Sequence, residues 1–239
     1  MIILYLVLFI TVITSGSLIF IFKSDNPKAL KLMLAFSGSF LIGISFLKLV
    51  PEVFSSNVRF AGLFVMFGYL LQLVLELITE GVEHGHSHVH REGEKVSPFI
   101  LLVGLCIHAF LEGTPIAAGV DPDVRRSLIV GIIVHNVPIS VTLMGLLLHY
   151  GCSRYKAFLY LSVFAVMTPL GSITSNLIPF TSGVSMQHFF TYIMAVVIGI
   201  FLHVSTSILF EAEDNHKYNI QKFVVICFGI AVAAGLTLL

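Results

Sequence analysis

Apolar runs of about twenty residues recur along the whole chain, and no other feature limits its fold as strongly. A helix needs roughly 20 mainly apolar residues to cross the hydrocarbon core of a bilayer. The runs do not alternate between apolar and polar residues, as the strands of a membrane barrel do. We therefore predict an all-α integral membrane protein with eight transmembrane helices. The eight segments are residues 2–22, 30–50, 60–80, 98–119, 127–148, 157–178, 190–210 and 221–238.

The composition agrees with lipid as the main solvent of the chain. Hydrophobic residues make up 57% of it and charged residues 11%, whereas soluble domains carry roughly 25% charged residues. The formal net charge is zero, which gives no reason to expect a nucleic-acid partner. We expect residues 1–239 to form a single polytopic domain. Its first apolar run lacks the basic start of a signal peptide and is interpreted as a retained span.

Lysine and arginine are distributed unevenly between the two sets of alternate loops. Cytoplasmic loops of membrane proteins carry the excess of these residues, so the richer set is assigned to the cytoplasm. We therefore predict a multi-pass protein of the cell membrane with both termini outside the cytoplasm. The richer set contains Lys23, Lys28, Lys31, Arg91, Lys95, Arg154, Lys156, Lys217 and Lys222, and the poorer set contains Arg59, Arg125 and Arg126.

The loop 81–97 falls on the predicted cytoplasmic side and contains alternating histidines. Histidine-rich tracts bind metal ions, and we expect weak metal binding here. The alternative is a loop whose histidines have little effect. The residues concerned are His84, His86, His88 and His90.

Three ionisable residues lie deep inside the fourth and fifth predicted spans. Such residues are costly in lipid and therefore candidates for function. His108 and Glu112 are four residues apart, so they share one helix face at about 6 Å. His108 lies ten residues after Pro98 and His135 ten residues after Arg125. Each distance is roughly 15 Å along a helix, which predicts that the side chains meet near the membrane midplane.

Imidazole nitrogen and carboxylate oxygen suit a borderline metal such as zinc. We therefore predict a metal site formed by His108, Glu112 and His135, with Asn136 as an additional candidate ligand. Ligand type discriminates poorly among transition metals, so Fe²⁺, Mn²⁺ and Cd²⁺ remain alternatives to Zn²⁺. The competing interpretation is a buried polar cluster that holds two helices together.

Two prolines follow the predicted ligands. Pro115 cannot donate to the carbonyl of Leu111, nor Pro138 to that of Val134. We expect kinked helices there, because freed backbone groups are tolerated at membrane depth where they line a cavity. The alternative is that both prolines only bend helices in a packed bundle.

Several motifs resemble those of the ZIP (Zrt/Irt-like) metal transporters. Residues 108–113 (HAFLEG) are similar to the fourth-span signature HxxxEG, and 135–138 (HNVP) to the fifth-span motif HNxPEG or HExPHE. Residues 49–52 (LVPE), 117–119 (AAG) and 169–171 (PLG) extend the resemblance. It implies eight spans, outside termini and movement of a divalent metal into the cytoplasm.

The sequence also departs from this family pattern. Ala109 stands where the family often has a polar residue. Ile139 replaces the usual carboxylate or histidine of the fifth span, and Thr168 replaces a common glutamate of the sixth. Family members can bind two metals side by side, whereas this chain retains ligands for one. We expect one ion, held by three side chains together with water or Asn136.

Further polar residues lie toward the predicted cytoplasmic end of the seventh span. His203, Ser207 and Glu211 follow one another at i+4 spacing on one face, and we interpret them as an exit pathway. A histidine bonded to a neighbouring helix is the alternative for His203. Glu76 and Glu80 in the third span are interpreted as side chains that extend to the interface.

Two other functions remain open at this point. One is a protein that binds metal as a sensor and does not transport it. The other is an intramembrane zinc hydrolase, although the sequence has no HExxH motif and no second mid-membrane carboxylate to act as a base. We therefore do not expect an enzyme. Small residues that permit close helix packing make a homodimer plausible; they are Gly38, Gly43, Gly62 and Gly68.

Overall fold

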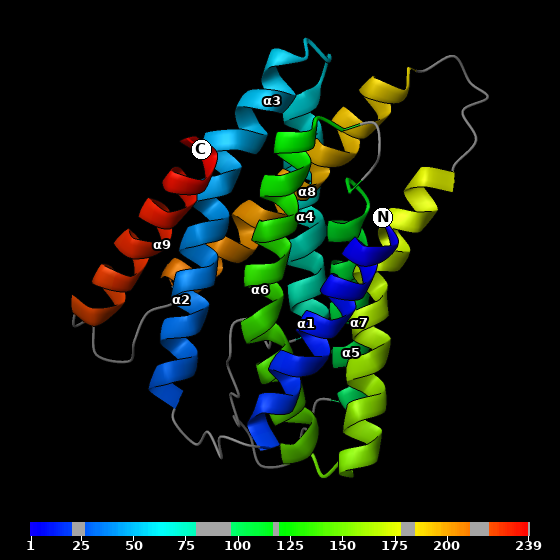
Figure 1. Cartoon of the computed structure of the whole chain (residues 1–239), viewed down its shortest axis with the longest axis vertical. Helices are drawn as coiled ribbons and strands as arrows, with labels where there is room; N and C mark the ends of the chain where they lie inside the picture. The colour runs from blue at the N-terminus through cyan, green and yellow to red at the C-terminus, as the bar shows by residue number, and fades with distance from the viewer. Residues whose placement is uncertain (21–26, 80–96, 117–119, 178–184, 211–219, 239) are drawn as a thin grey trace.

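Figure 1 shows the computed structural model of the protein, which is a bundle of long helices. It describes residues 1–20, 27–79, 97–116, 120–177, 185–210 and 220–238, and these contain no strand. The helices are α1 (Ile2–Ser17), α2 (Pro27–Ile44), α3 (Val50–Ser55), α4 (Ala61–Thr79), α5 (Pro98–Gly113), α6 (Pro122–His149), α7 (Arg154–Leu177), α8 (Met186–Phe210) and α9 (Ile220–Leu238). A short 3₁₀ turn, η1 (Leu18–Phe20), follows α1, and a π-helical segment, η2 (Ser45–Leu49), joins α2 to α3.

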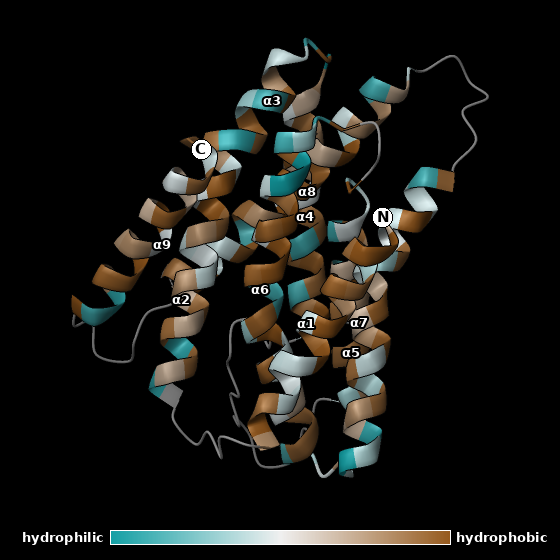
Figure 2. Ribbon diagram, in the orientation of Figure 1, coloured by the Kyte–Doolittle hydropathy of each residue, from teal (hydrophilic) through white to brown (hydrophobic). Residues whose placement is uncertain are grey.

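The predicted fold class is confirmed, with seven helical segments long and apolar enough to cross a membrane. The remaining predicted span corresponds to α5, an apolar helix of 16 residues. In Figure 2 hydrophobic residues cover most of the length of the helices, and hydrophilic residues lie mainly near their ends. Large apolar side chains also point outward, as at Leu63, Phe67 and Leu77 of α4. These are the features of a multi-pass membrane protein.

The second predicted span ends later than expected. We predicted a span over residues 30–50, but the helical path continues from Lys28 to Ser55. Pro51 lies in the first turn of α3, so it is inside this continuous helical path and does not end it. The π-helical segment η2 precedes this turn and connects it to α2.

Two large hydrophobic cores organise the described part of the bundle, beside a small cluster of Leu34, Val204 and Ile208. One is formed mainly by α2, α8 and the first half of α6, and the other by α5, α7 and the second half of α6. In addition, α4 packs chiefly against α8, and α2 against α9. Ile132 of α6 belongs to the first core and Ile139 to the second. His135 and Asn136 therefore lie on α6 between the part of the helix that contributes to the first core and the part that contributes to the second.

Glycines allow several of these helices to approach closely. A Cβ atom on Gly68 would lie 1.9 Å from the carbonyl oxygen of Val196, so α4 and α8 meet backbone to backbone there. Gly38 likewise packs against Ile208 of α8, and Gly43 against Ala233 of α9. These three glycines thus serve contacts within one chain. The predicted homodimer remains a prediction.

Candidate metal centre

His108, Glu112 and His135 converge in the interior of the bundle, and all three side chains are fully buried. The Nε2 atom of His108 lies 2.9 Å from Oε1 of Glu112. The Nε2 atom of His135 lies 3.8 Å from the same oxygen. The structure thus brings together the three residues that the sequence selected. Among the residues it describes, they form the one group of three or more His, Cys, Asp or Glu side chains that could hold a metal ion.

Local structure accounts for this convergence. His108 and Glu112 share one face of α5 because they are one helical turn apart. Gly113 then lets α5 pack tightly on α7, since a Cβ atom there would lie 2.1 Å from the carbonyl oxygen of Thr168. His135 approaches from α6, which starts at the N-cap Asp121, whose side chain accepts hydrogen bonds from two backbone amides. Close helix packing and a capped start therefore fix the positions of the three side chains.

The arrangement suits a zinc-sized cation. One ligand atom from each residue can be chosen so that all three lie within 4.8 Å of one another. Tetrahedral zinc with ligands at about 2.0–2.2 Å places those ligands roughly 3.3–3.6 Å apart, so small side-chain movements would complete the geometry. The second carboxylate oxygen of Glu112, Oε2, is buried and has no hydrogen-bond partner among the described residues. A buried carboxylate of this kind is expected to be compensated by a cation or a proton.

Gln72 of α4 is a further residue of this centre that the sequence analysis missed. Its side chain is fully buried, and its Oε1 atom lies 2.9 Å from Nδ1 of His108. The available signal was a single amide in the otherwise apolar stretch 61–75. An amide costs less in lipid than an ionised group, so a single glutamine in an apolar span does not by itself indicate a functional site.

The positions where the family usually carries further ligands have other roles here. Ile139 is buried in the apolar core around α5 and α7. The Ser140 hydroxyl lies 2.7 Å from that of Ser15 on α1, and it also donates to the backbone carbonyl of Asn136. Asn136 itself is buried, and its Oδ1 atom has no partner among the described residues. Its role as a ligand remains a prediction.

The two prolines differ in their positions. Pro138 lies inside α6, and the predicted kink there remains a prediction. Pro115 lies beyond the end of α5 at Gly113, so it does not kink that helix as we predicted. The carbonyl of Leu111 is not left free either, because it accepts hydrogen bonds from the backbone N–H and the hydroxyl of Thr114.

Side chains of α7 stabilise the backbone where α5 ends. The hydroxyl of Ser172 and the amide of Asn176 donate to the carbonyl of Ile116. The hydroxyl of Ser175 donates to the carbonyl of Thr114 at 2.7 Å. Non-helical backbone is tolerated at membrane depth when protein groups satisfy it in this way. The sequence could not indicate these bonds, because they join residues far apart in the chain.

The predicted exit residues lie only partly within the described structure. His203 of α8 is buried, and its Nε2 atom lies 3.3 Å from Oε2 of Glu76 on α4. Glu76 therefore pairs with a neighbouring helix, contrary to our interpretation that it merely extends to the interface. Ser207 is half-buried. Glu211 and the loop histidines His84, His86, His88 and His90 lie outside the described residues.

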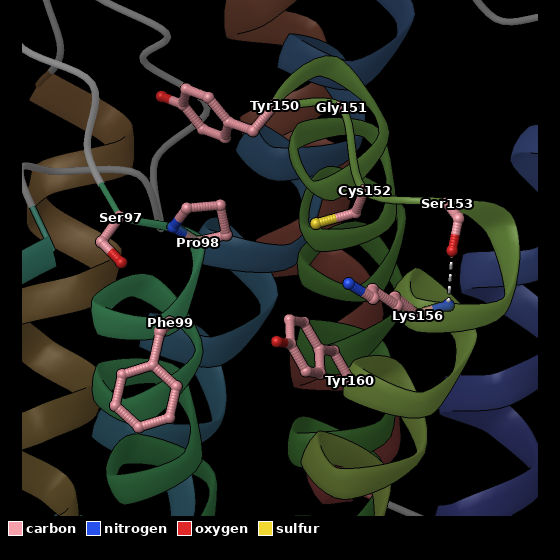
Figure 3. Close-up of a pocket in the computed structure, with 9 residues that line it drawn as sticks. All are labelled: Ser97, Pro98, Phe99, Tyr150, Gly151, Cys152, Ser153, Lys156 and Tyr160. Carbon is pink, nitrogen blue, oxygen red and sulfur yellow. Dashed lines mark hydrogen bonds between the residues drawn. The ribbon is translucent and has the colours of Figure 1, made fainter.

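A separate cavity of about 430 Å³ lies between the start of α5 and the turn that joins α6 to α7 (Figure 3). Its lining includes Pro98, Tyr150, Lys156 and Tyr160. None of the residues described as lining it belongs to the His108–Glu112–His135 centre. The metal centre is thus a buried cluster apart from this cavity.

A multi-pass helical bundle with two histidines and a glutamate converging in its interior defines the class: a polytopic membrane protein with a candidate metal centre. Comparison with known proteins then identifies the family. The sequence profile of the ZIP zinc transporters matches residues 80–237, which is more than half of the chain. The chain belongs to the ZIP zinc transporter family, as its motifs suggested.

Individual relatives are more distant. The protein zntD of Dictyostelium discoideum is 28% identical over 173 residues, which cover 65% of this chain and 25% of zntD. Zinc transporter ZIP9-B of Xenopus laevis is 28% identical over 123 residues, 49% of this chain and 40% of the relative. Zinc transporter ZIP9 of Micropogonias undulatus is 28% identical over 114 residues, 46% of this chain and 36% of the relative. The chain thus matches between a quarter and two fifths of the length of these relatives.

Proposed function

We propose that this protein moves divalent transition-metal ions, Zn²⁺ first among them, across the membrane through the His108–Glu112–His135 centre. The observation that carries the proposal is the convergence of these three fully buried side chains inside a membrane bundle. Membership of a zinc transporter family supports it. The ion is substrate here, so a site with three protein ligands suits the need to bind it and then release it.

We further propose that transport is directed into the cytoplasm. The distribution of lysine and arginine supports outside termini, and the histidine-rich loop 81–97 would then receive the ion on the cytoplasmic side. The Glu76–His203 pair supports a path in that direction, because Glu76 lies one helical turn beyond Gln72, which contacts the centre. Ser207 would continue the path along α8, and Glu211, which follows α8 in the sequence, lies outside the described residues.

Zinc uptake into proteoliposomes containing a fluorescent zinc indicator tests the proposal. His108→Ala, Glu112→Gln and His135→Ala each remove one ligand and should abolish uptake. His188→Ala is the matched control, because it removes an exposed histidine at the start of α8 and should leave uptake unchanged. Circular dichroism and size-exclusion chromatography would verify that each variant is folded. The same assay with Fe²⁺, Mn²⁺ and Cd²⁺ gives the order of preference.

Three outcomes separate the candidate functions. Uptake that disappears in the three ligand variants and persists in His188→Ala supports transport through the centre. Stoichiometric zinc binding without uptake by the wild type would instead indicate a sensor. Uptake that survives all three ligand substitutions would contradict the assignment of the centre.

A further inference from the structure

Gln72 and His108 connect α4 to the candidate metal centre on α5. Both side chains are fully buried, and the 2.9 Å separation of Oε1 and Nδ1 is that of a hydrogen bond. The two helices are in close contact nearby, because a Cβ atom on Gly104 of α5 would lie 2.2 Å from the methyl carbon of Thr79 on α4. Tight packing thus places Gln72 against the ring of His108.

The hydrogen-bonding groups around His108 limit where its ring proton can lie. Nδ1 faces the carbonyl oxygen of Gln72, and Nε2 faces the carboxylate of Glu112 at 2.9 Å. A neutral imidazole donates from one nitrogen and offers a lone pair from the other. The oxygen of Gln72 and the carboxylate of Glu112 can both only accept, and a neutral ring can donate to one of them. When a cation lies between Nε2 and Glu112, the ring proton therefore belongs on Nδ1, where the Gln72 oxygen accepts it. The lone pair on Nε2 then faces Glu112 and is available to a cation that both groups can bind.

We propose that Gln72 is a positioning residue of the metal centre: by accepting the Nδ1–H of His108, it holds the tautomer in which Nε2 is directed at the metal ion. This proposal rests on the proposed function, because it takes His108 as a metal ligand. Histidine ligands commonly donate their second N–H to an oxygen, which fixes the ring and raises its basicity. Here an amide from a different helix provides that oxygen, so α4 contributes to the centre without contacting the ion.

The tautomer can be measured directly in the full-length, zinc-loaded protein. Nitrogen-15 chemical shifts distinguish protonated, unprotonated and metal-bound imidazole nitrogens. After selective labelling of histidine, the signals of His108 are assigned by their loss in His108→Ala. We expect a protonated Nδ1 and a metal-bound Nε2. If the Gln72 amide has the opposite orientation and donates to Nδ1, the proton lies on Nε2, and that result would overturn the proposal.

Zinc affinity provides a second and independent test. Gln72→Leu removes the acceptor at similar volume and should weaken zinc binding by about 10–100-fold, the usual effect of losing such a partner. Gln72→Glu keeps an oxygen acceptor and should bind zinc nearly as tightly as the wild type. Thr142→Val is the matched control, because Thr142 is a buried polar residue of α6 whose hydroxyl donates to the Pro138 carbonyl of its own helix. It should leave the affinity unchanged.

The outcomes separate this proposal from the proposed function. Equal zinc affinities of the wild type and of Gln72→Leu would refute the positioning role but leave the metal centre intact. A wild type that does not bind zinc refutes both. Weakened binding in Gln72→Leu with near-wild-type binding in Gln72→Glu supports the positioning role when the nitrogen-15 shifts also place the proton on Nδ1, because glutamate restores the shape of glutamine as well as its acceptor.

Discussion

The carboxylate of Glu76 on α4 lies 3.3 Å from the imidazole of His203 on α8. The Glu76 side chain is 23% exposed, whereas that of His203 is buried. The aromatic ring of Tyr69, also on α4, lies edge-on to the same imidazole. Together they form a polar contact between two helices that are otherwise joined mainly by apolar side chains and glycines. The proposed path along α4 leads to this pair, because Glu76 lies one helical turn beyond Gln72, which contacts His108.

Glu76→Gln should therefore slow zinc uptake without changing zinc affinity at the centre. Loss of one charge-assisted contact is worth about 1.5 kcal/mol, which corresponds to roughly a tenfold lower rate. Initial rates in proteoliposomes and equilibrium binding in detergent measure the two quantities separately. Thr206→Val on α8 is a suitable control, because its hydroxyl bonds to carbonyls of its own helix. An unchanged rate in Glu76→Gln would remove the pair from the pathway.

Zinc should stabilise the folded protein through the three ligands. A ligand that binds only the native state at about 100 times its dissociation constant adds about 2.7 kcal/mol. The wild type should therefore unfold at a higher temperature with zinc than without it. His135→Ala should lose most of this increase, whereas His188→Ala should retain it. Equal stabilisation of all three proteins would mean that zinc binds elsewhere.

Gly113→Ala should destabilise the protein and weaken zinc binding. The added methyl group would lie 2.1 Å from the carbonyl oxygen of Thr168, which is backbone and cannot rotate away, so α5 must move off α7. Overpacking of this kind costs about 1–3 kcal/mol, and the movement displaces Glu112, the adjacent residue. Thermal unfolding in detergent and zinc titration measure the two effects.

Gly235→Ala on α9 is the matched control for that substitution. No neighbouring atom lies within 4 Å of a Cβ atom at this position. Because alanine favours a helix over glycine by roughly 0.5–1 kcal/mol, this variant should be at least as stable as the wild type. Similar losses in both variants would show that close packing at Gly113 is not the cause.

The centre should hold one zinc ion per chain. Ile139 lies in an apolar core and Ser140 is bonded to Ser15, so neither provides the additional carboxylate that a second ion would need. The loop histidines could bind additional zinc, so the measurement uses a variant that combines His84→Ala, His86→Ala, His88→Ala and His90→Ala. Elemental analysis of that variant after dialysis should give one zinc per chain. The same variant with the further substitution Glu112→Gln should retain none. A ratio of two would contradict the reduced site.

The sequence by itself determined the features that depend on neighbours along the chain. The number and approximate limits of the spans follow from the length of apolar runs, because each helix satisfies its own backbone in lipid. The shared face of His108 and Glu112 follows from helical spacing alone. His135 could be added because the short connection between its helix and the preceding one makes the two antiparallel neighbours. The motifs around these residues were also sufficient to identify the family.

Only the tertiary structure decided which distant helices supply the partners of these residues. Gln72 contacts His108, and Glu76 contacts His203, although nothing local to either helix specifies its neighbour. The same limit explains the error at Pro115, whose surrounding carbonyls are satisfied partly by α7. Packing between helices depends on the shapes of whole faces, which glycines such as Gly68 and Gly113 set through backbone contact. Spacing along one helix therefore predicts a ligand pair, whereas its supporting partners require the assembled bundle.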